Sequence, residues 1–151
     1  MGKISGWRVI AGGVLAGLVL FFEQGYVHMM LLHDAGVELA KAGILRADFE
    51  TGPAVKIQCI LDLGTGILLA WLYAAIRPRL GAGLQTAIMT GLAVWLLLFF
   101  QAFVPNALWT PRLAPGAVYA ALGDFFGLTV GAAIAGWVYS EHGGEGSRKG
   151  R

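Results

Sequence analysis

Charged residues are scarce in this chain: they make up 13% of its 151 residues, whereas hydrophobic residues make up 57%. In a soluble domain roughly a quarter of the residues are charged, because its surface has to be solvated. The composition therefore excludes an ordinary soluble domain and predicts a membrane protein. The net charge of +2 is small and comes mostly from residues beside the apolar segments, so it gives no support to nucleic-acid binding.

Cysteine and the common catalytic motifs are also missing. Cys59 is the only cysteine, which excludes an intrachain disulfide. There is no glycine-rich phosphate loop, nucleophile elbow, His-Glu-x-x-His or Cys-x-x-Cys pattern. His28 and His33 would point about 140° apart on one helix, so they cannot hold a haem within one subunit. We therefore expect a non-enzymatic protein with no catalytic residue, no metal and no other cofactor.

The chain does contain four long apolar runs. They cover residues 9–32, 57–76, 87–104 and 117–139. Each is close to the roughly 20 residues that cross a hydrocarbon core, and lipid demands helices because backbone polar groups must be satisfied internally. The predicted fold class is all-α: an integral membrane four-helix bundle with short loops over residues 1–142. Residues 143–151 are predicted to form a disordered cytoplasmic tail.

Lys and Arg residues predict how the runs cross the membrane. One side carries Lys3, Arg8, Arg77, Arg79, Arg148, Lys149 and Arg151. The opposite side carries fewer basic residues, and acids offset some of them, so both termini are expected to face the cytoplasm. A cleaved signal peptide is the rival interpretation of the first run, but that run is longer than a signal peptide's apolar region and contains Glu23.

The first and third runs resemble each other. Residues 13–24, GVLAGLVLFFEQ, align without gaps on residues 91–102, GLAVWLLLFFQA, which pairs Glu23 with Gln101. The second and fourth runs both end in Trp-x-Tyr, as Trp71-Leu-Tyr73 and Trp137-Val-Tyr139. We interpret the chain as two tandem transmembrane hairpin repeats related by a pseudo-two-fold axis along the membrane normal. Chance similarity between two Leu/Phe-rich helices is the alternative.

Three of the runs carry an acidic residue. A carboxylate in hydrocarbon costs roughly a few kcal/mol unless it is paired, protonated or wetted, so these residues are the first place to look for function. At 1.5 Å per residue, the acids and Gln101 fall about 5 to 14 Å below the outer surface, and we predict that the acids face the bundle interior. The candidate ligand, proton or ion site is Glu23, Asp62, Asp124, His28, Gln58 and Gln101.

The role of these polar residues stays open between two interpretations. They either form structural hydrogen bonds across helices, or they handle protons, ions or a ligand. In the fourth run, Gly123, Gly127 and Gly131 recur at steps of four, and Asp124 lies beside them. Such a stripe predicts close helix packing, within one chain or between chains, although glycine is also common in membrane helices.

The stretch between the first two runs, residues 34–50, has an imperfect amphipathic pattern. Val37, Ala40, Ile44 and Leu45 share one helical face, but Lys41 intrudes on it. A short surface helix that docks on a partner and an irregular loop are both compatible with this pattern.

One segment resembles a known group of proteins. Residues 70–81, AWLYAAIRPRLG, together with Thr86-Ala87 and residues 91–95, GLAVW, resemble an uncharacterised family of small four-helix bacterial inner-membrane proteins. The resemblance is specific over residues 64–96. It implies a location in the bacterial inner (plasma) membrane, and it implies no activity, because the family has no assigned chemistry.

Two functions from different classes follow. We expect a multi-pass membrane protein that acts as a helix-packing or accessory subunit, surrounded by the lipid bilayer and assembled as a homo-oligomer or within a membrane-protein complex. The alternative is a small proton- or cation-coupled transporter or channel that uses the intramembrane acids. A membrane enzyme that acts on lipid or quinone is a remote third option, because no catalytic constellation supports it.

Overall fold

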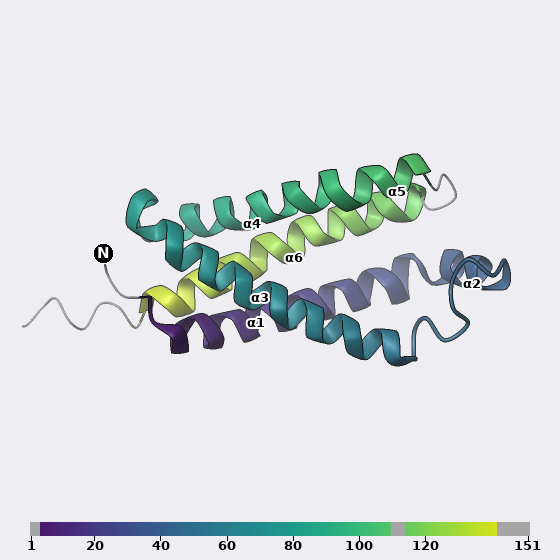
Figure 1. Cartoon of the computed structure of the whole chain (residues 1–151), viewed down its shortest axis with the longest axis horizontal. Coiled ribbons are helices and arrows are strands. Elements are labelled where there is room, and N and C mark those ends of the chain that lie inside the picture. The colour runs from purple at the N-terminus through teal and green to yellow at the C-terminus, as the bar shows by residue number, and fades with distance from the viewer. Residues whose placement is uncertain (1–3, 110–113, 142–151) are drawn as a thin grey trace, which may run out of the picture.

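The computed structural model describes residues 4–109 and 114–141, and every regular element in these ranges is helical. Four long helices, α1 (Gly6–Tyr26), α3 (Pro53–Leu80), α4 (Leu84–Leu98) and α6 (Ala114–Glu141), form an elongated bundle (Figure 1). Two short helices, α2 (His33–Lys41) and α5 (Val104–Trp109), lie at one end, which we call the α2 end. The all-helical fold expected from the composition is confirmed. The predicted tail, residues 143–151, lies outside the described residues.

Four segments of this bundle are long and apolar enough to cross a membrane. They are Gly6–Leu31, Pro53–Leu80, Leu84–Phe103 and Gly116–Tyr139. The second extends beyond the predicted run at both ends. Pro53 begins α3 because the first turn of a helix does not need the proline N–H, and Gly81, with a φ of 88°, ends it.

Two of the long helices continue into π-helical turns at the α2 end. Residues Val27–Leu31 follow α1, and residues Phe99–Phe103 follow α4. A π-helical turn is wider than an α-helical turn, so it changes the direction of the side chains that follow it. The phase of a regular helix, on which the sequence-based predictions relied, therefore does not hold in these two segments.

Glycines allow the helix backbones to touch. A Cβ built on Gly66 of α3 would collide with the Gly13 carbonyl oxygen of α1. In the other half of the bundle, a Cβ on Gly91 of α4 would lie 2.6 Å from the Leu128 carbonyl oxygen of α6. Close approach of this kind increases the dispersion contacts between the helices. Such contacts matter between apolar helices in lipid, because the hydrophobic effect does not drive their association there.

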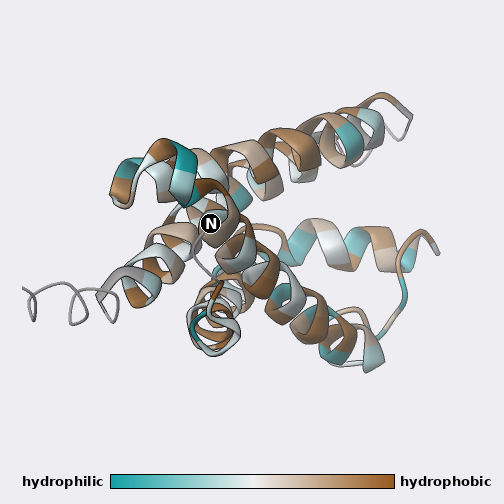
Figure 2. Ribbon diagram, turned by 60° about the vertical axis from the view of Figure 1, so that its left-hand side comes forward, coloured by the Kyte–Doolittle hydropathy of each residue, from teal (hydrophilic) through white to brown (hydrophobic). Residues whose placement is uncertain are grey.

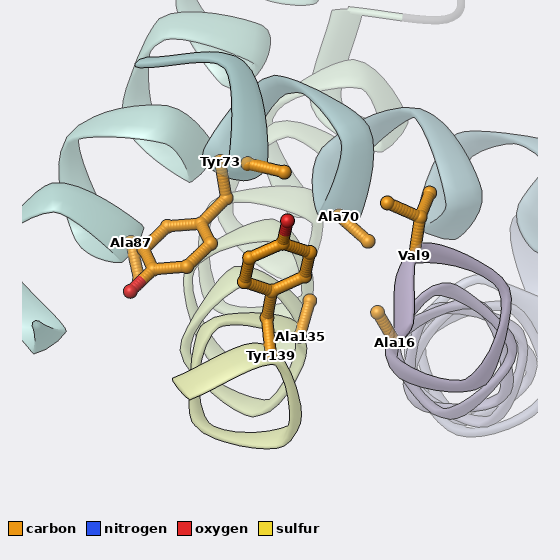
Figure 3. Packing of buried hydrophobic residues seen from close by; sticks show 8 residues of the cluster. Val9, Ala16, Ala70, Tyr73, Ala87, Ala135 and Tyr139 are labelled. Atoms are coloured by element: carbon orange, nitrogen blue, oxygen red, sulfur yellow. The ribbon is translucent and has the colours of Figure 1, made fainter. Parts of the chain in front are cut away.

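The end of the bundle opposite α2 is held by two buried tyrosines. The rings of Tyr73 and Tyr139 meet edge to face, with centroids 6.1 Å apart, among small apolar side chains (Figure 3). The backbone N–H of Gly83 donates to the Tyr73 hydroxyl at 3.2 Å, and the Arg77 guanidinium lies 5.4 Å from the Tyr139 ring centroid. These contacts fix the turn between α3 and α4 against the end of α6.

The surface of the long helices is strongly apolar. Large hydrophobic side chains are exposed on all four, including Trp7 at 76%, Phe22 at 69% and Phe126 at 63%. In Figure 2, hydrophobic residues extend along the long helices, and hydrophilic residues gather mainly near their ends. A protein with such a surface would aggregate in water, whereas lipid solvates apolar side chains.

The stretch at residues 34–50 is part helix and part turn. It begins as α2 and then folds back, so that a Cβ on Gly36 would lie 2.6 Å from the Phe49 ring. His33 and Glu50 form an ion pair at 2.7 Å, which ties the start of α2 to the segment before α3. The paired Glu50 raises the pKa of His33 above its usual value.

Candidate functional site

Polar side chains from α1, α3 and α6 meet in the half of the bundle near α2. We call this group the polar cluster, and it consists of Glu23, Gln24, His28, Gln58, Asp62 and Asp124. Each of the three helices contributes one carboxylate. When the π-helical turn that follows α1 is included, Glu23, Asp62 and Asp124 lie 8, 9 and 10 residues from Leu31, Pro53 and Ala114, the ends of their helical segments nearest α2. Neighbouring helices therefore bring the three acids to a similar depth.

A chain of hydrogen bonds joins the three helices through two glutamine side chains. The Gln58 amide donates to Asp62 Oδ1 at 2.9 Å and to Gln24 Oε1 at 3.1 Å, and the Gln24 amide in turn donates to Asp124 Oδ1 at 3.0 Å. Gln24 therefore lies in the middle, accepting from α3 and donating to α6. Side-chain amides suit this position because each offers both a donor and an acceptor.

Glu23 lies directly against the glycine stripe of α6. A Cβ built on Gly123 would collide with Glu23 Oε1, and one built on Gly127 would lie 2.6 Å from Oε2. These two glycines therefore leave the space that the carboxylate occupies. A Cβ built on Gly131, the third glycine of the stripe, would lie 3.4 Å from the Ala16 carbonyl oxygen of α1, so the whole stripe packs within the chain.

Several carboxylate oxygens in the cluster are buried without a hydrogen-bond partner among the described residues. These are Glu23 Oε1, Glu23 Oε2 and Asp62 Oδ2. Asp62 is almost completely buried, with only 3% of its surface exposed, and Glu23 interacts electrostatically with both Asp124 and Asp62. A buried carboxylate of this kind is costly unless a proton, a cation or water compensates it.

A cavity of about 160 Å³ opens beside the cluster. Its lining residues are Glu23, Gln24, Val27, His28, Phe103, Ala120 and Asp124. At about 30 Å³ per water molecule, this volume has room for roughly five waters. Glu23 and Asp124 line it, whereas Asp62 does not. His28 lies at the wall of the cavity, with Nδ1 3.0 Å from the Gln24 carbonyl oxygen. The cavity thus lies beside two of the three acids, Glu23 and Asp124.

A larger groove of about 490 Å³ lies on another side of α1, between that helix, the start of α3 and the segment before it. It is lined mainly by aromatic, Met and small apolar side chains, and Gln24, Gln58, His28 and Glu50 supply its polar groups. Gln24 and His28 line both the cavity and the groove. The end of α1 therefore separates a small polar space from a large apolar one.

The structure brings most of the candidate site residues together and separates one from them. The acids Glu23, Asp62 and Asp124 converge as the depth count predicted. Gln101, expected at the same layer as the repeat partner of Glu23, instead has an exposed side chain. The reason is local: Glu23 lies in regular α-helix, whereas Gln101 falls inside the π-helical turn Phe99–Phe103, which changes the phase of its side chain.

Gln24 is the central residue that the sequence-based candidate site omitted. The signal was present, because a polar residue next to Glu23 interrupts an otherwise apolar run. Adjacent residues on a helix point about 100° apart, however, so Gln24 and Glu23 could not both be assigned to the interior without knowing which helices lie on either side of α1. In the structure, α3 and α6 both pack on α1: Glu23 lies against α6, and Gln24 is hydrogen-bonded to both α3 and α6.

Within the described residues, no group of three or more His, Cys, Asp or Glu side chains is arranged to hold a metal ion. No family model, curated protein or solved structure matches this chain. The resemblance to the small four-helix bacterial family therefore stays a prediction, and function has to be inferred from the site.

Proposed function

We propose that the chain is a multi-pass integral membrane protein whose four long apolar helices cross the bilayer, built from two tandem hairpin repeats. The apolar surface of all four helices supports the membrane location. By the distribution of Lys and Arg, both termini face the cytoplasm of a bacterial inner membrane, and the α2 end faces outward.

Two helix contacts support the repeat. The alignment of the first and third apolar runs makes Gly13 and Gly91 equivalent, and the Trp-x-Tyr alignment makes Gly66 and Ala132 equivalent. A Cβ on Gly66 would collide with Gly13, and a Cβ on Gly91 would lie 3.1 Å from the Ala132 side chain. Equivalent residues are therefore in contact in both hairpins.

The tyrosines at the opposite end supply a second argument for the repeat. Tyr73 and Tyr139 occupy equivalent positions in the two Trp-x-Tyr motifs, and their rings touch each other. A two-fold axis passing between equivalent residues produces a contact of this kind, because each residue then meets its own counterpart.

We infer that the polar cluster binds protons and that the protein is a small proton-coupled transporter. The observation that carries this is the meeting of three carboxylates from three helices, with the Glu23 oxygens buried and unpartnered among the described residues. Three neighbouring carboxylates in a largely apolar bundle cannot all stay ionised without a counter-charge.

Infrared difference spectroscopy of the full chain in lipid nanodiscs tests proton binding directly. Titration from alkaline buffer down to about pH 6, a range in which exposed carboxylates stay ionised, should reveal a carboxylic-acid carbonyl stretch, and Glu23→Gln should remove a large part of it. Glu38→Gln, which changes an exposed acid on α2, is the matched control and should leave the titration unchanged. Identical titrations of the wild type and of Glu23→Gln, Asp62→Asn and Asp124→Asn would reject the proposal.

The accessory-subunit function makes the opposite prediction for the same variants. Under that function Asp62→Asn is nearly silent, while Gly127→Leu changes assembly with other chains. The packing of Gly127 on Leu20 and Glu23 of α1 argues for the transporter, because the glycine stripe is already covered within the chain. Oligomer size measured by native mass spectrometry separates the two functions: the transporter proposal expects Asp62→Asn to abolish coupled flux at unchanged oligomer size.

A further inference from the structure

The apolar groove beside the polar cluster suggests what is transported, an inference that rests on the proton-coupled function proposed above. The groove is about three times as large as the polar cavity, about 490 Å³ against about 160 Å³. Its size suits a small organic molecule, which needs roughly 300 to 1,000 Å³. A proton or a hydrated inorganic ion does not need an apolar space of this kind.

The walls of the groove are aromatic and sulfur-containing. The contributing side chains are Phe21, Phe22, Tyr26, Met29, Met30 and Phe49. Aromatic faces attract cations, by about 0.5 to 2 kcal/mol depending on how far water is excluded. Methionines adapt to ligands of different shape because their side chains are flexible and polarizable. These walls therefore favour an apolar molecule that carries positive charge.

The floor of the groove leads to negative charge. Gln58 lines the groove and donates to Asp62, and Gln24 lines it and donates to Asp124. Asp62 lies behind this floor, with 3% of its surface exposed, and its Oδ2 has no hydrogen-bond partner among the described residues. Glu50 also lies at the wall, where it is paired with His33, and His28 is the other ionisable lining residue; none of the described lining residues is Lys or Arg. The groove and its floor are thus complementary to a cation.

We propose that the groove binds an amphipathic organic monocation, an ammonium or phosphonium with an apolar body, and that this cation is the substrate exchanged for protons at the polar cluster. The apolar body occupies the aromatic and methionine walls, and the charged centre lies over Gln24 and Gln58. Because the cation and a proton neutralise the same carboxylates, binding of the cation releases a proton. Gln24 links the two events, since it lines both spaces and is hydrogen-bonded to Asp124.

Equilibrium binding of tetraphenylphosphonium to the full chain in nanodiscs tests this inference. Tetraphenylborate has the same shape and the opposite charge, so it separates charge recognition from simple partition into lipid. The wild type should bind the phosphonium saturably, show no saturable binding of the borate, and release a proton on binding. Calorimetry in two buffers of different ionisation enthalpy measures the proton release.

Two kinds of variant locate the site. The groove variant combines Phe22→Ala with Tyr26→Ala, both exposed side chains, and should weaken phosphonium binding about tenfold, the loss expected for removing aromatic contacts to a cation. The matched control is Phe126→Ala, an equally exposed phenylalanine on α6 that does not line the groove. Asp62→Asn should weaken binding by a similar factor and remove the proton release.

The outcomes distinguish this inference from the function on which it rests. Unchanged phosphonium affinity in the groove variant, or equal saturable binding of the borate, would overturn the organic-cation substrate while leaving proton binding intact. A groove filled by a co-purified lipid that the phosphonium does not displace would also overturn it. If instead the wild type and Glu23→Gln give the same infrared carboxyl titration, the proton-coupled function itself is rejected.

Discussion

At the residue scale, the polar cluster depends on the match between one long acidic side chain and two positions without a side chain. Glu23 fits against α6 because Gly123 and Gly127 have no Cβ. The glycine stripe thus has two roles, close packing at Gly131 and space for a carboxylate at the other two positions. A stripe of small residues in a membrane helix indicates close approach, but it does not indicate whether a backbone or a polar side chain approaches.

Replacing Gly127 tests this packing. Gly127→Ala should destabilise the folded protein by about 1 to 3 kcal/mol, because the added methyl overlaps Glu23 Oε2 and approaches Leu20 within 3.2 Å. Gly64→Ala is the matched control: no atom lies within 4 Å of its added Cβ, so it should be neutral or slightly stabilising. Reversible unfolding in mixed micelles measures both. Equal stability of the two variants would contradict the packing of Glu23 against the stripe.

The bridging amide of Gln24 makes a second prediction at this scale. Gln24→Ala removes the amide that donates to Asp124 and accepts a hydrogen bond from Gln58. It should therefore lower the free energy of unfolding by about 1 to 3 kcal/mol. Gln101→Ala, at an exposed glutamine without a hydrogen bond in the described structure, should change stability by less than about 0.5 kcal/mol. The same unfolding measurement compares them, and a larger loss for Gln101→Ala would place Gln101 in the cluster after all.

At the element scale, short segments decide how the long helices end. The π-helical turn Val27–Leu31 ends α1 beside the groove, and α2 then returns toward α3. The ion pair of His33 with Glu50 holds this return segment, because it joins the first residue of α2 to a residue three positions before Pro53. Anything that opens this pair loosens the wall of the groove that Phe49 and Glu50 form.

The pair predicts how α2 responds to pH. Glu50 raises the pKa of His33, so the stabilising contribution is complete below the ordinary His pKa of about 6.5 and is lost as the pH rises through the higher folded-state value. Amide hydrogen exchange in α2, corrected for the intrinsic pH dependence, should therefore become faster above neutral pH. Glu50→Gln should make α2 exchange fast throughout, while the amides of α6 serve as the internal reference. Exchange in α2 that stays independent of pH would show that the pair does not hold it.

At the scale of the whole molecule, the two-hairpin arrangement makes a prediction about sidedness. In a Cys59→Ala background, Ala47→Cys places a thiol between α2 and α3, and Ala82→Cys places one between α3 and α4. An impermeant maleimide added to intact cells should label the first and label the second only after permeabilisation, because the basic residues near the α3–α4 turn favour the cytoplasm. The reverse labelling pattern would invert the orientation and place the polar cavity on the cytoplasmic side.

Features that depend on nearby residues were predicted correctly, whereas features that depend on helix packing or on a change of helix type were not. The four helices and the convergence of three acids were predictable, because hydropathy and depth depend only on nearby residues and helix rise. Gln101 was misplaced, because its helix changes to a π-helical turn that the apolar pattern does not reveal. Gln24 was omitted, because its role depends on α3 and α6 lying on two sides of α1.

The sequence by itself determined that the chain is all-helical, that four of its segments are apolar enough to cross a membrane, and that acids lie at a similar depth in three of them. The tertiary structure decided which faces meet: Glu23 against the glycines of α6, Gln24 between two helices, and an apolar groove apart from a polar cavity. The physical reason is that hydropathy is nearly uniform around these helices, so steric fit at glycines and hydrogen bonds between a few polar side chains select the packing.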